Sequence, residues 1–203
     1  MTNAGLLILG FGGHGRSVAD VALAAGYRTL RFVDEAARPG EHFLTFPIVR
    51  AIGDLPADWA WFAASGDGAR RFGQIADRHL DHARLATIVS PLAHVSDSVT
   101  IGRGTVVGHF AHIGPRSHIG EGCILNTAAI VEHDCVVGAF SHVSVNATLA
   151  GGARVGSRVF VGAGAVVIDS IVVADDVVIG AGATVVCDIA EPGTYAGTPA
   201  TRL

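Results

Sequence analysis

An aliphatic residue recurs at every sixth position from Val89 to Val185, without an insertion or a slip. This period fits neither the repeat of about 3.6 residues of an α-helix nor the alternation of a simple strand. Self-similarity at a fixed short period is instead typical of a repeat architecture. Six residues suffice for one short strand and one corner, so three repeats form a triangular coil whose aliphatic side chains point inward. One coil cannot bury that face alone, whereas a stack of coils can.

Glycine often follows the aliphatic residue of a repeat, as at Gly102, Gly108 and Gly114. We expect these glycines to occupy corners, because a left-handed backbone conformation costs glycine little. Two positions before the aliphatic residue there is usually a smaller side chain, and Cys123 and Cys135 take this place. Each buried aliphatic side chain contributes about 1.5–3 kcal/mol. The ladder therefore predicts a stable prism of stacked coils.

The segment before the repeats reads as half of a nucleotide-binding fold. The apolar run from Leu6 to Leu9 predicts a buried strand, and the run from Gly10 to Gly15, GFGGHG, matches the pattern G-x-G-x-x-G. A helix is expected from Arg16 to Ala25, and a second strand from Leu30 to Val33 ends at Asp34. Such glycines let the backbone approach a phosphate at the start of the helix, where free N–H groups and the dipole favour an anion. The alternative is a tight turn that packs the helix on the strand.

A dinucleotide cofactor such as NAD is not expected. Only about 85 residues precede the repeats, and a dinucleotide fold normally uses two such halves. A third apolar segment, Trp59 to Ala64, and a helix from about Ala69 to His82 lead directly into the first coil. A nucleotide-linked substrate fits this size better, and we expect Gly12 and Gly13 to contact it. Asp34 either bonds a ribose or a base, or simply forms a turn.

Composition argues against several classes of function. The chain has 203 residues, a formal net charge of −4 and no basic run, so nucleic acid and anionic membranes are not expected partners. The start of the sequence lacks the basic region of a signal peptide, and no apolar run approaches transmembrane length. We therefore expect a cytoplasmic protein without membrane insertion. The three cysteines have no paired metal spacing, and no metal site is predicted.

The repeat pattern strongly resembles that of the hexapeptide-repeat acyltransferases, which are left-handed β-helices. A glycine-rich nucleotide domain, an uninterrupted repeat with Asn126, and the run from Val131 to Asp134, VEHD, are together similar to the sugar O-acyltransferase/sialic-acid acetyltransferase-like family. The members most similar to this chain acetylate nucleotide-linked 4-amino sugars. The resemblance covers essentially the whole chain and implies a homotrimer with acetyl-CoA between neighbouring β-helices. It also implies that His133 is the general base and that the glycine loop with His14 lies beside the nucleotide sugar.

Acetyl transfer to an amine requires a base, a thioester within reach and support for the oxyanion. Histidine suits the proton transfer, because its reference pKa is about 6.5. His133 lies near a corner, and three repeats later Gly151 and Gly152 carry no side chain, which leaves room for a substrate above the imidazole. The resemblance implies that Asp134 orients the imidazole as in a triad, although adjacent residues of an extended chain tend to point apart. The alternative for His133 is a surface histidine at a corner.

A stripe of small residues is the predicted surface for the pantetheine arm of acetyl-CoA. The runs 162–165 and 180–183 both read GAGA and lie three repeats apart, so they stack in consecutive coils. The alternative is that small corners simply suit the repeat. The resemblance places His142 near the acetyl group, and Asn126 either bonds the sugar or His133, or forms a left-handed corner. The expected cofactor contacts are His142, Gly151, Gly162, Ala163 and Gly180.

The predicted fold is mainly β. A small α/β Rossmann-like domain, residues 1–85, binds a nucleotide sugar, and a left-handed parallel β-helix, residues 86–203, carries the acetyltransferase site. The predicted function is acetyl-CoA-dependent N-acetylation of a nucleotide-linked amino sugar, of the UDP-4-amino-4,6-dideoxyhexose type, for glycan or O-antigen synthesis. One alternative changes the acceptor to a sugar hydroxyl, as in sialic-acid O-acetylation, and another is a non-catalytic β-helix scaffold. His94 and His112 lie three repeats apart, but two histidines without acids are a poor zinc set.

Overall fold

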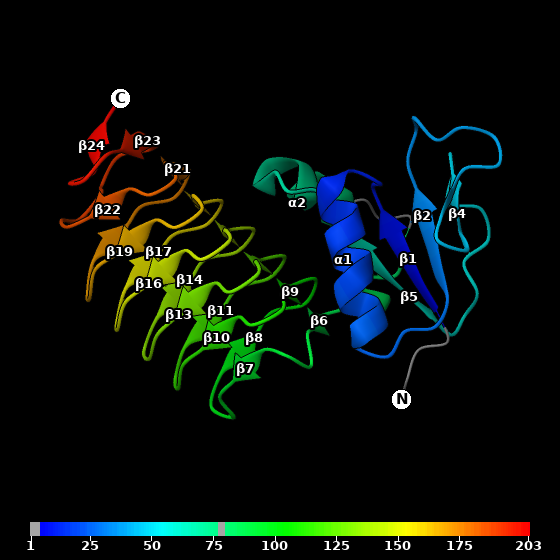
Figure 1. Ribbon diagram of the computed structural model, residues 1–203, viewed down its shortest axis with the longest axis horizontal. Helices are drawn as coiled ribbons and strands as arrows, with labels where there is room; N and C mark the ends of the chain where they lie inside the picture. The colour runs from blue at the N-terminus through cyan, green and yellow to red at the C-terminus, as the bar shows by residue number, and fades with distance from the viewer. Residues whose placement is uncertain (1–4, 77–79) are drawn as a thin grey trace.

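The computed structural model describes residues 5–76 and 80–203. Figure 1 shows a small α/β domain beside a long prism of stacked strands that ends at the C-terminus. The predicted order of an α/β domain followed by a parallel β-helix of hexapeptide repeats is confirmed. Within the described residues, no helix combines the length and the apolar character needed to cross a membrane.

The N-terminal domain is a sheet of mainly parallel strands in the order β3-β4-β2-β1-β5. Its strands are β1 (Gly5–Leu9), β2 (Leu30–Val33), β3 (His42–Phe43), β4 (Phe46–Val49) and β5 (Trp59–Ala63). Only the β3–β4 pair is antiparallel among the pairings described for this sheet. The parallel β1–β2 pair with α1 between its strands is the predicted nucleotide-binding half.

The helices differ from the predicted ones at their ends. Helix α1 (Gly13–Ala24) begins inside the glycine run, because Gly12 takes an extended conformation and serves as the N-cap. Helix α2 (Gly68–Ala76) is shorter than the segment predicted from Ala69 to His82. Residues 77–79 of that segment lie outside the described residues, and His82–Arg84 form the 3-10 turn η1.

The prism has three faces, each built from every third strand. Face 1 contains β6 (Ile88–Val89), β9 (Val106–Val107), β12 (Ile124–Leu125), β15 (His142–Val143), β18 (Phe160–Val161) and β21 (Val177–Ile179), and β23 (Gly193–Ala196) and β24 (Thr201–Arg202) extend it. Face 2 contains β7 (His94–Val95), β10 (His112–Ile113), β13 (Ile130–Val131), β16 (Thr148–Leu149), β19 (Val166–Val167) and β22 (Thr184–Val185). Face 3 contains β8 (Thr100–Ile101), β11 (His118–Ile119), β14 (Val136–Val137), β17 (Arg154–Val155) and β20 (Val172–Val173).

Three consecutive strands make one coil, and each coil pairs in register with the coil below. Val131 pairs with Ile113 on one side and with Leu149 on the other, and all three side chains are fully buried. The inward positions of the ladder thereby form one continuous core along the prism. We call the turn after a face 1 strand corner 1/2, the turn after a face 2 strand corner 2/3, and the turn after a face 3 strand corner 3/1.

The expected role of the corner glycines is wrong in one respect. The glycine directly after the ladder residue is not left-handed. A Cβ at Gly114 would lie 2.7 Å from the backbone nitrogen of His133 in the next coil, so close stacking requires glycine there. The left-handed residue comes two positions later, as at Arg116 (φ 61°) and Ala128 (φ 53°). Asn126 is therefore not the left-handed residue of its corner.

The two domains pack closely on face 1 and corner 3/1. Val106 and Ile124, which point out from face 1, belong to the same apolar cluster as Val18 and Val21 of α1. Arg71 of α2 is fully buried at the junction. Its guanidinium donates hydrogen bonds to carbonyl oxygens of both domains, which fixes the loop before α2 against the prism.

Candidate active site

His133 and Asp134 occupy corner 2/3 of the third coil, the coil of β12, β13 and β14. The Nδ1 atom of His133 lies 2.9 Å from Oδ2 of Asp134. The prediction that these neighbours interact therefore agrees with their geometry. The left-handed conformation of Asp134, with φ at 60°, turns its carboxylate back toward the imidazole.

Arg116 occupies the same corner one coil below and completes this group. Its Nε atom lies 3.0 Å from Oδ1 of Asp134. The hydrogen bond from His133 and the charge of Arg116 lower the pKa of the Asp134 carboxyl. An ionised Asp134 accepts the Nδ1 hydrogen of His133, which leaves the Nε2 lone pair free to take a proton. The side chain of His133 is 59% exposed, so a substrate or a neighbouring chain can reach it.

Gly151 makes room for the imidazole itself. A Cβ at Gly151 would lie 2.7 Å from Nε2 and Cε1 of His133. Gly152 donates its backbone N–H to the carbonyl of His133 at 2.8 Å. The space above the histidine, which the sequence suggested for a substrate, is thus partly filled by the ring.

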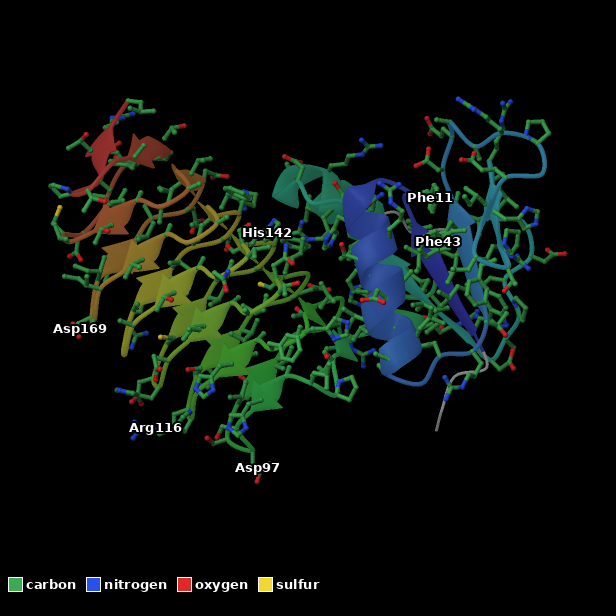
Figure 2. The ribbon with its side chains drawn as sticks, in the orientation of Figure 1. Phe11, Phe43, Asp97, Arg116, His142 and Asp169 are labelled. Atoms are coloured by element: carbon green, nitrogen blue, oxygen red, sulfur yellow. The ribbon has the colours of Figure 1, made fainter. Side chains whose placement is uncertain are left out.

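His142 points out from face 1 toward the N-terminal domain, as Figure 2 shows. The Nδ2 atom of Asn126 lies 3.2 Å from Nε2 of His142, and Nδ1 lies 3.4 Å from the carbonyl oxygen of Gly66. The Oδ1 atom of Asn126 accepts the N–H of Thr127, which fixes the amide orientation. Asn126 therefore bonds His142 and not His133. This pattern assigns the hydrogen of His142 to Nδ1.

His14 faces His142 across the junction between the domains, with the ring centroids 6.1 Å apart. Burial, as the main cause, and the charge of Arg71 together lower the pKa of both histidines to about 4. Both imidazoles are consequently neutral at physiological pH. The Nε2 atom of His14 is buried and has no hydrogen-bond partner among the described residues. A buried polar atom of this kind is suited to bond a ligand.

A cavity of about 270 Å³ lies at the start of α1. Gly12, Gly13, His14 and Asp34 line it together with the loop before α2 and Arg70. Nothing lies within 4 Å of a Cβ placed at Gly12 or Gly13, so this side of the loop is open. Free N–H groups at the helix start and a nearby arginine favour an anionic group there.

Asp34 also has a structural role, as the alternative interpretation suggested. Its carboxylate accepts the backbone N–H of Phe11 at 2.9 Å and that of Ala36 at 3.0 Å. These bonds, with the Phe11 bond the stronger influence, lower the pKa of Asp34. Asp34 thereby holds the glycine loop in place while its side chain still lines the cavity.

A smaller cavity of about 100 Å³ separates α1 from corner 1/2 of the prism. His14, Asn126 and Thr127 line it, so it joins the glycine loop to the third coil. The small residues Gly162, Ala163 and Gly180 belong to the same corner, in the fifth and sixth coils. Nothing lies within 4 Å of a Cβ at Gly164 or Gly182, which leaves this part of the corner open.

The candidate residues thus form two groups that one chain does not bring together. His14, His142 and Asn126 lie between the domains and at corner 1/2. His133 and Asp134 lie at corner 2/3, at the other end of strand β13. Figure 2 shows Arg116, the partner of Asp134, on the far side of the prism from the N-terminal domain.

Three contributors were not among the predicted residues. Arg116 precedes Asp134 by three repeats, so the spacing of the ladder alone places the two residues one above the other. The guanidinium of Arg71 donates to backbone carbonyl groups, and Gly66 contributes its own carbonyl oxygen, so neither contact has a pattern in the sequence. The rings of His94 and His112 stack on face 2 with centroids 5.2 Å apart. Across residues 5–76 and 80–203, no group of three or more potential metal ligands occurs.

Comparison with known proteins gives consistent results for both domains. Residues 5–72 match the family described as the PglD N-terminal domain. The acetyltransferase domain of PglB from Neisseria gonorrhoeae FA1090, in complex with acetyl coenzyme A, is 36% identical with a TM-score of 0.90, and the match covers 100% of each chain. A mutant of GDP-perosamine N-acetyl transferase from Caulobacter crescentus, in complex with CoA and GDP-perosamine, is 34% identical with a TM-score of 0.86, covering 98% of this chain and 96% of that one.

WeeI from Acinetobacter baumannii AYE shares the fold, with a TM-score of 0.83 at 21% identity over 98% of this chain and 99% of that one. A search of curated proteins found no match. The two more similar structures are matched over nearly their whole length, glycine loop and β-helix together. The chain therefore belongs to the hexapeptide-repeat family of nucleotide-sugar acetyltransferases.

Proposed function

We propose that the protein transfers the acetyl group of acetyl-CoA to the amino group of a nucleotide-linked amino sugar. The observation that carries this proposal is the His133–Asp134 pair, an imidazole with one nitrogen held by a carboxylate and the other free. Support comes from the similar PglB domain in complex with acetyl coenzyme A and from the transferase in complex with CoA and GDP-perosamine. The sugar class we favour is a 4-amino-4,6-dideoxyhexose on UDP or another nucleoside diphosphate, used in glycan synthesis.

In this proposal residues 1–85 bind the nucleotide sugar. The diphosphate lies at the start of α1, where Gly12 and Gly13 leave the cavity open. The sugar extends past His14, whose free Nε2 bonds a hydroxyl or ring oxygen, toward the cavity at corner 1/2. Neutral histidines suit this task, because they offer hydrogen bonds without adding a charge beside the amine.

The pantetheine arm of acetyl-CoA runs along corner 1/2 over Gly162, Ala163 and Gly180, where exposed backbone groups bond its amides. The hydrogen bonds of His142 to Asn126 and Gly66 engage both of its ring nitrogens. We therefore assign His142 the role of a neutral wall beside the acetyl group. Gly151 contributes to the site because the absence of a Cβ leaves space for the imidazole of His133.

The reaction follows from the free Nε2 of His133. The amine nitrogen attacks the thioester carbonyl carbon, and a C–N bond forms as its proton passes to Nε2. Asp134 stabilises the resulting imidazolium, and Arg116 keeps Asp134 in place. The C–S bond then breaks, the carbonyl reforms, and the thiolate of CoA takes the proton from His133. The products are the N-acetyl sugar and CoA.

In this proposal, the group of His14, His142 and Asn126 from one chain meets His133 and Asp134 from a neighbouring chain. His133 lies at one edge of face 2, and Asn126 with the cofactor stripe lies at the other edge. Three copies arranged in a ring bring corner 2/3 of each chain to corner 1/2 of the next. Closed cyclic symmetry with such a head-to-tail contact is a common form of assembly. We therefore propose a homotrimer with acetyl-CoA between neighbouring prisms.

An acceptor screen tests the function. The protein is mixed with acetyl-CoA and with UDP-, GDP- or dTDP-linked amino sugars, each paired with the corresponding hydroxy sugar, and free thiol is measured. We expect thiol release with at least one amino sugar and none with its hydroxy partner. Release with hydroxy sugars alone would favour sugar O-acetylation. No release and no thermal shift with acetyl-CoA would favour a non-catalytic scaffold.

A further inference from the structure

Phe110 is an exposed aromatic residue in a left-handed conformation. It is the third residue of corner 1/2 in the second coil, with φ at 60°. This conformation is the regular one for the third corner residue of the prism, as at Arg116 and Ala128, so the repeat itself sets it. The residue is 65% exposed in the single chain. Its ring centroid lies 6.4 Å from that of His109, so one chain leaves most of this aromatic side chain uncovered.

Phe140 provides an internal comparison. It holds the same position in corner 3/1 of the next coil, with φ at 61°. The residue is only 9% exposed, and its ring packs edge-on against Phe72 of α2, with the ring centroids 5.2 Å apart. At Phe140 the second domain of the same chain covers the aromatic corner. By the same reasoning, a second protein surface covers Phe110.

The ladder indicates which surface this is. Asn126 and His133 lie at opposite ends of β13, in one coil. Rotation about an axis parallel to the prism moves no residue up or down, so the ring brings His133 of the partner subunit level with Asn126. Phe110 and Arg116 lie at opposite ends of β10, one coil lower. The same rotation brings Arg116 of the partner subunit level with Phe110.

The chemistry of the two side chains is complementary. Arg116 is 79% exposed, and its Nε is engaged with Asp134, so the flat face of its guanidinium is available. An aromatic ring against such a face is a favourable cation–π contact. Above Phe110 the column of corner 1/2 continues with Ala128, which is small, and with Asn146 and Gly164. Corner 1/2 therefore carries a large side chain one coil below the level of His133, and smaller side chains at that level and above it.

We propose that Phe110 packs on Arg116 of the partner subunit and closes the floor of the shared active site. The inference rests on the proposed function and adds a positioning residue to it. Phe110 holds the arginine that holds Asp134, and Asp134 in turn orients His133. The ring also covers the reacting amine from below and excludes water from the base.

Cross-linking tests this contact without reference to activity. In a Cys187→Ser background, which removes the exposed cysteine and keeps the two buried ones, Phe110→Cys and Arg116→Cys are combined and treated with a short bis-maleimide. We expect covalent dimers and trimers on a denaturing gel. Leu44→Cys combined with Arg116→Cys is the control and remains monomeric. Equal cross-linking of the two pairs, or none in the first, would overturn the inference.

Kinetics then test the positioning role. Phe110→Gly and Leu44→Gly are matched, since both remove an exposed apolar side chain from a left-handed residue; Leu44 has φ at 55° and is 68% exposed. We expect Phe110→Gly to lower kcat about tenfold while Leu44→Gly is unchanged. Phe110→Gly combined with Arg116→Ala should lower kcat no further than Arg116→Ala alone. If the two substitutions lowered kcat independently, so that their effects multiplied in the double variant, the contact would be contradicted. The proposed function would still stand in that case, because it depends only on the activity of the wild-type enzyme.

Discussion

The molecule contains two groups of histidines that differ in nearly every physical respect. His133 is mostly exposed, at the edge of the prism, and its partner is the ionised carboxylate of Asp134, which Arg116 also contacts. His14 and His142 are half-buried between the domains, and their partial burial is the main reason that their pKa falls to about 4. The exposed imidazole can exchange protons with a substrate, whereas the buried pair remains neutral and offers fixed hydrogen bonds. In the proposed function, the same residue type serves as a base in one place and as a binding surface in the other.

Removing the base should have the largest effect. We expect His133→Ala to lower kcat at least ~10²-fold, the usual scale for loss of a general base. Binding of CoA, followed by thermal shift, should persist, because the stripe at corner 1/2 is unchanged. His118→Ala is the matched control, since His118 is another exposed histidine of the prism, on face 3. Turnover near the wild-type level in His133→Ala would rule out this residue as the base.

Arg71 should contribute strongly to the free energy of unfolding, because it lies buried at the junction between the two domains. Its substitution by Met leaves the carbonyl groups of Ser65, Gly122 and Phe140 without their donor. An unsatisfied buried polar group costs about 1–3 kcal/mol, partly offset here by the relief of burying a charge. We expect Arg71→Met to lower the free energy of unfolding in urea by about 2–3 kcal/mol.

The neighbouring Arg70 is exposed and provides the control for this measurement. Arg70→Met should change the free energy of unfolding by less than about 0.5 kcal/mol, as is usual at the surface. Similar values for the two variants would show that Arg71 does not tie the domains together.

Acid should weaken the buried region through its histidines. Each has a folded pKa of about 4, below its ordinary value of 6.5, so the unfolded chain binds more protons between these two pH values. Their contribution is fully present above pH 6.5, declines as the pH falls, and levels off below about 4. Each histidine then contributes a drop of about 2 kcal/mol in the free energy of unfolding between pH 7 and pH 5, so we expect about 3–4 kcal/mol for the pair.

His142→Gln should reduce this pH dependence by roughly half, because one of the two groups no longer titrates. His118→Gln, which alters an exposed histidine, should leave it unchanged. A decline of equal size in His142→Gln would assign the acid sensitivity to other residues.

Much of the fold could be predicted because the ladder is regular. Side-chain size at every sixth position specifies which residues point inward and which lie one above another. The contact between Arg116 and Asp134 is equally readable, since three repeats separate them. By contrast, the junction of the domains depends on Arg71 and on backbone carbonyl groups, and carbonyl groups have no sequence signature.

The division of the candidate residues between two sides of the prism was not predicted. The resemblance gives a role to His133 and another to His142, but it does not say where each lies on the prism. Counting strands from the ladder assigns His133 to corner 2/3 and His142 to face 1, which are different sides of the prism. A functional role transferred residue by residue from a family does not reveal which chain of an assembly supplies each residue.

The central claim is that the site is shared between subunits, and complementation tests it most directly. Gly13→Asp places a carboxylate at the helix start, where it favours the helix but repels a diphosphate. His133→Ala removes the base at corner 2/3, the edge of face 2 that lies opposite corner 1/2. Each variant alone should be inactive, while trimers reassembled from an equal mixture should regain roughly a quarter of the wild-type activity, the share of interfaces with both intact halves. A mixture as inactive as its components, in trimers shown to be mixed, would contradict the shared site.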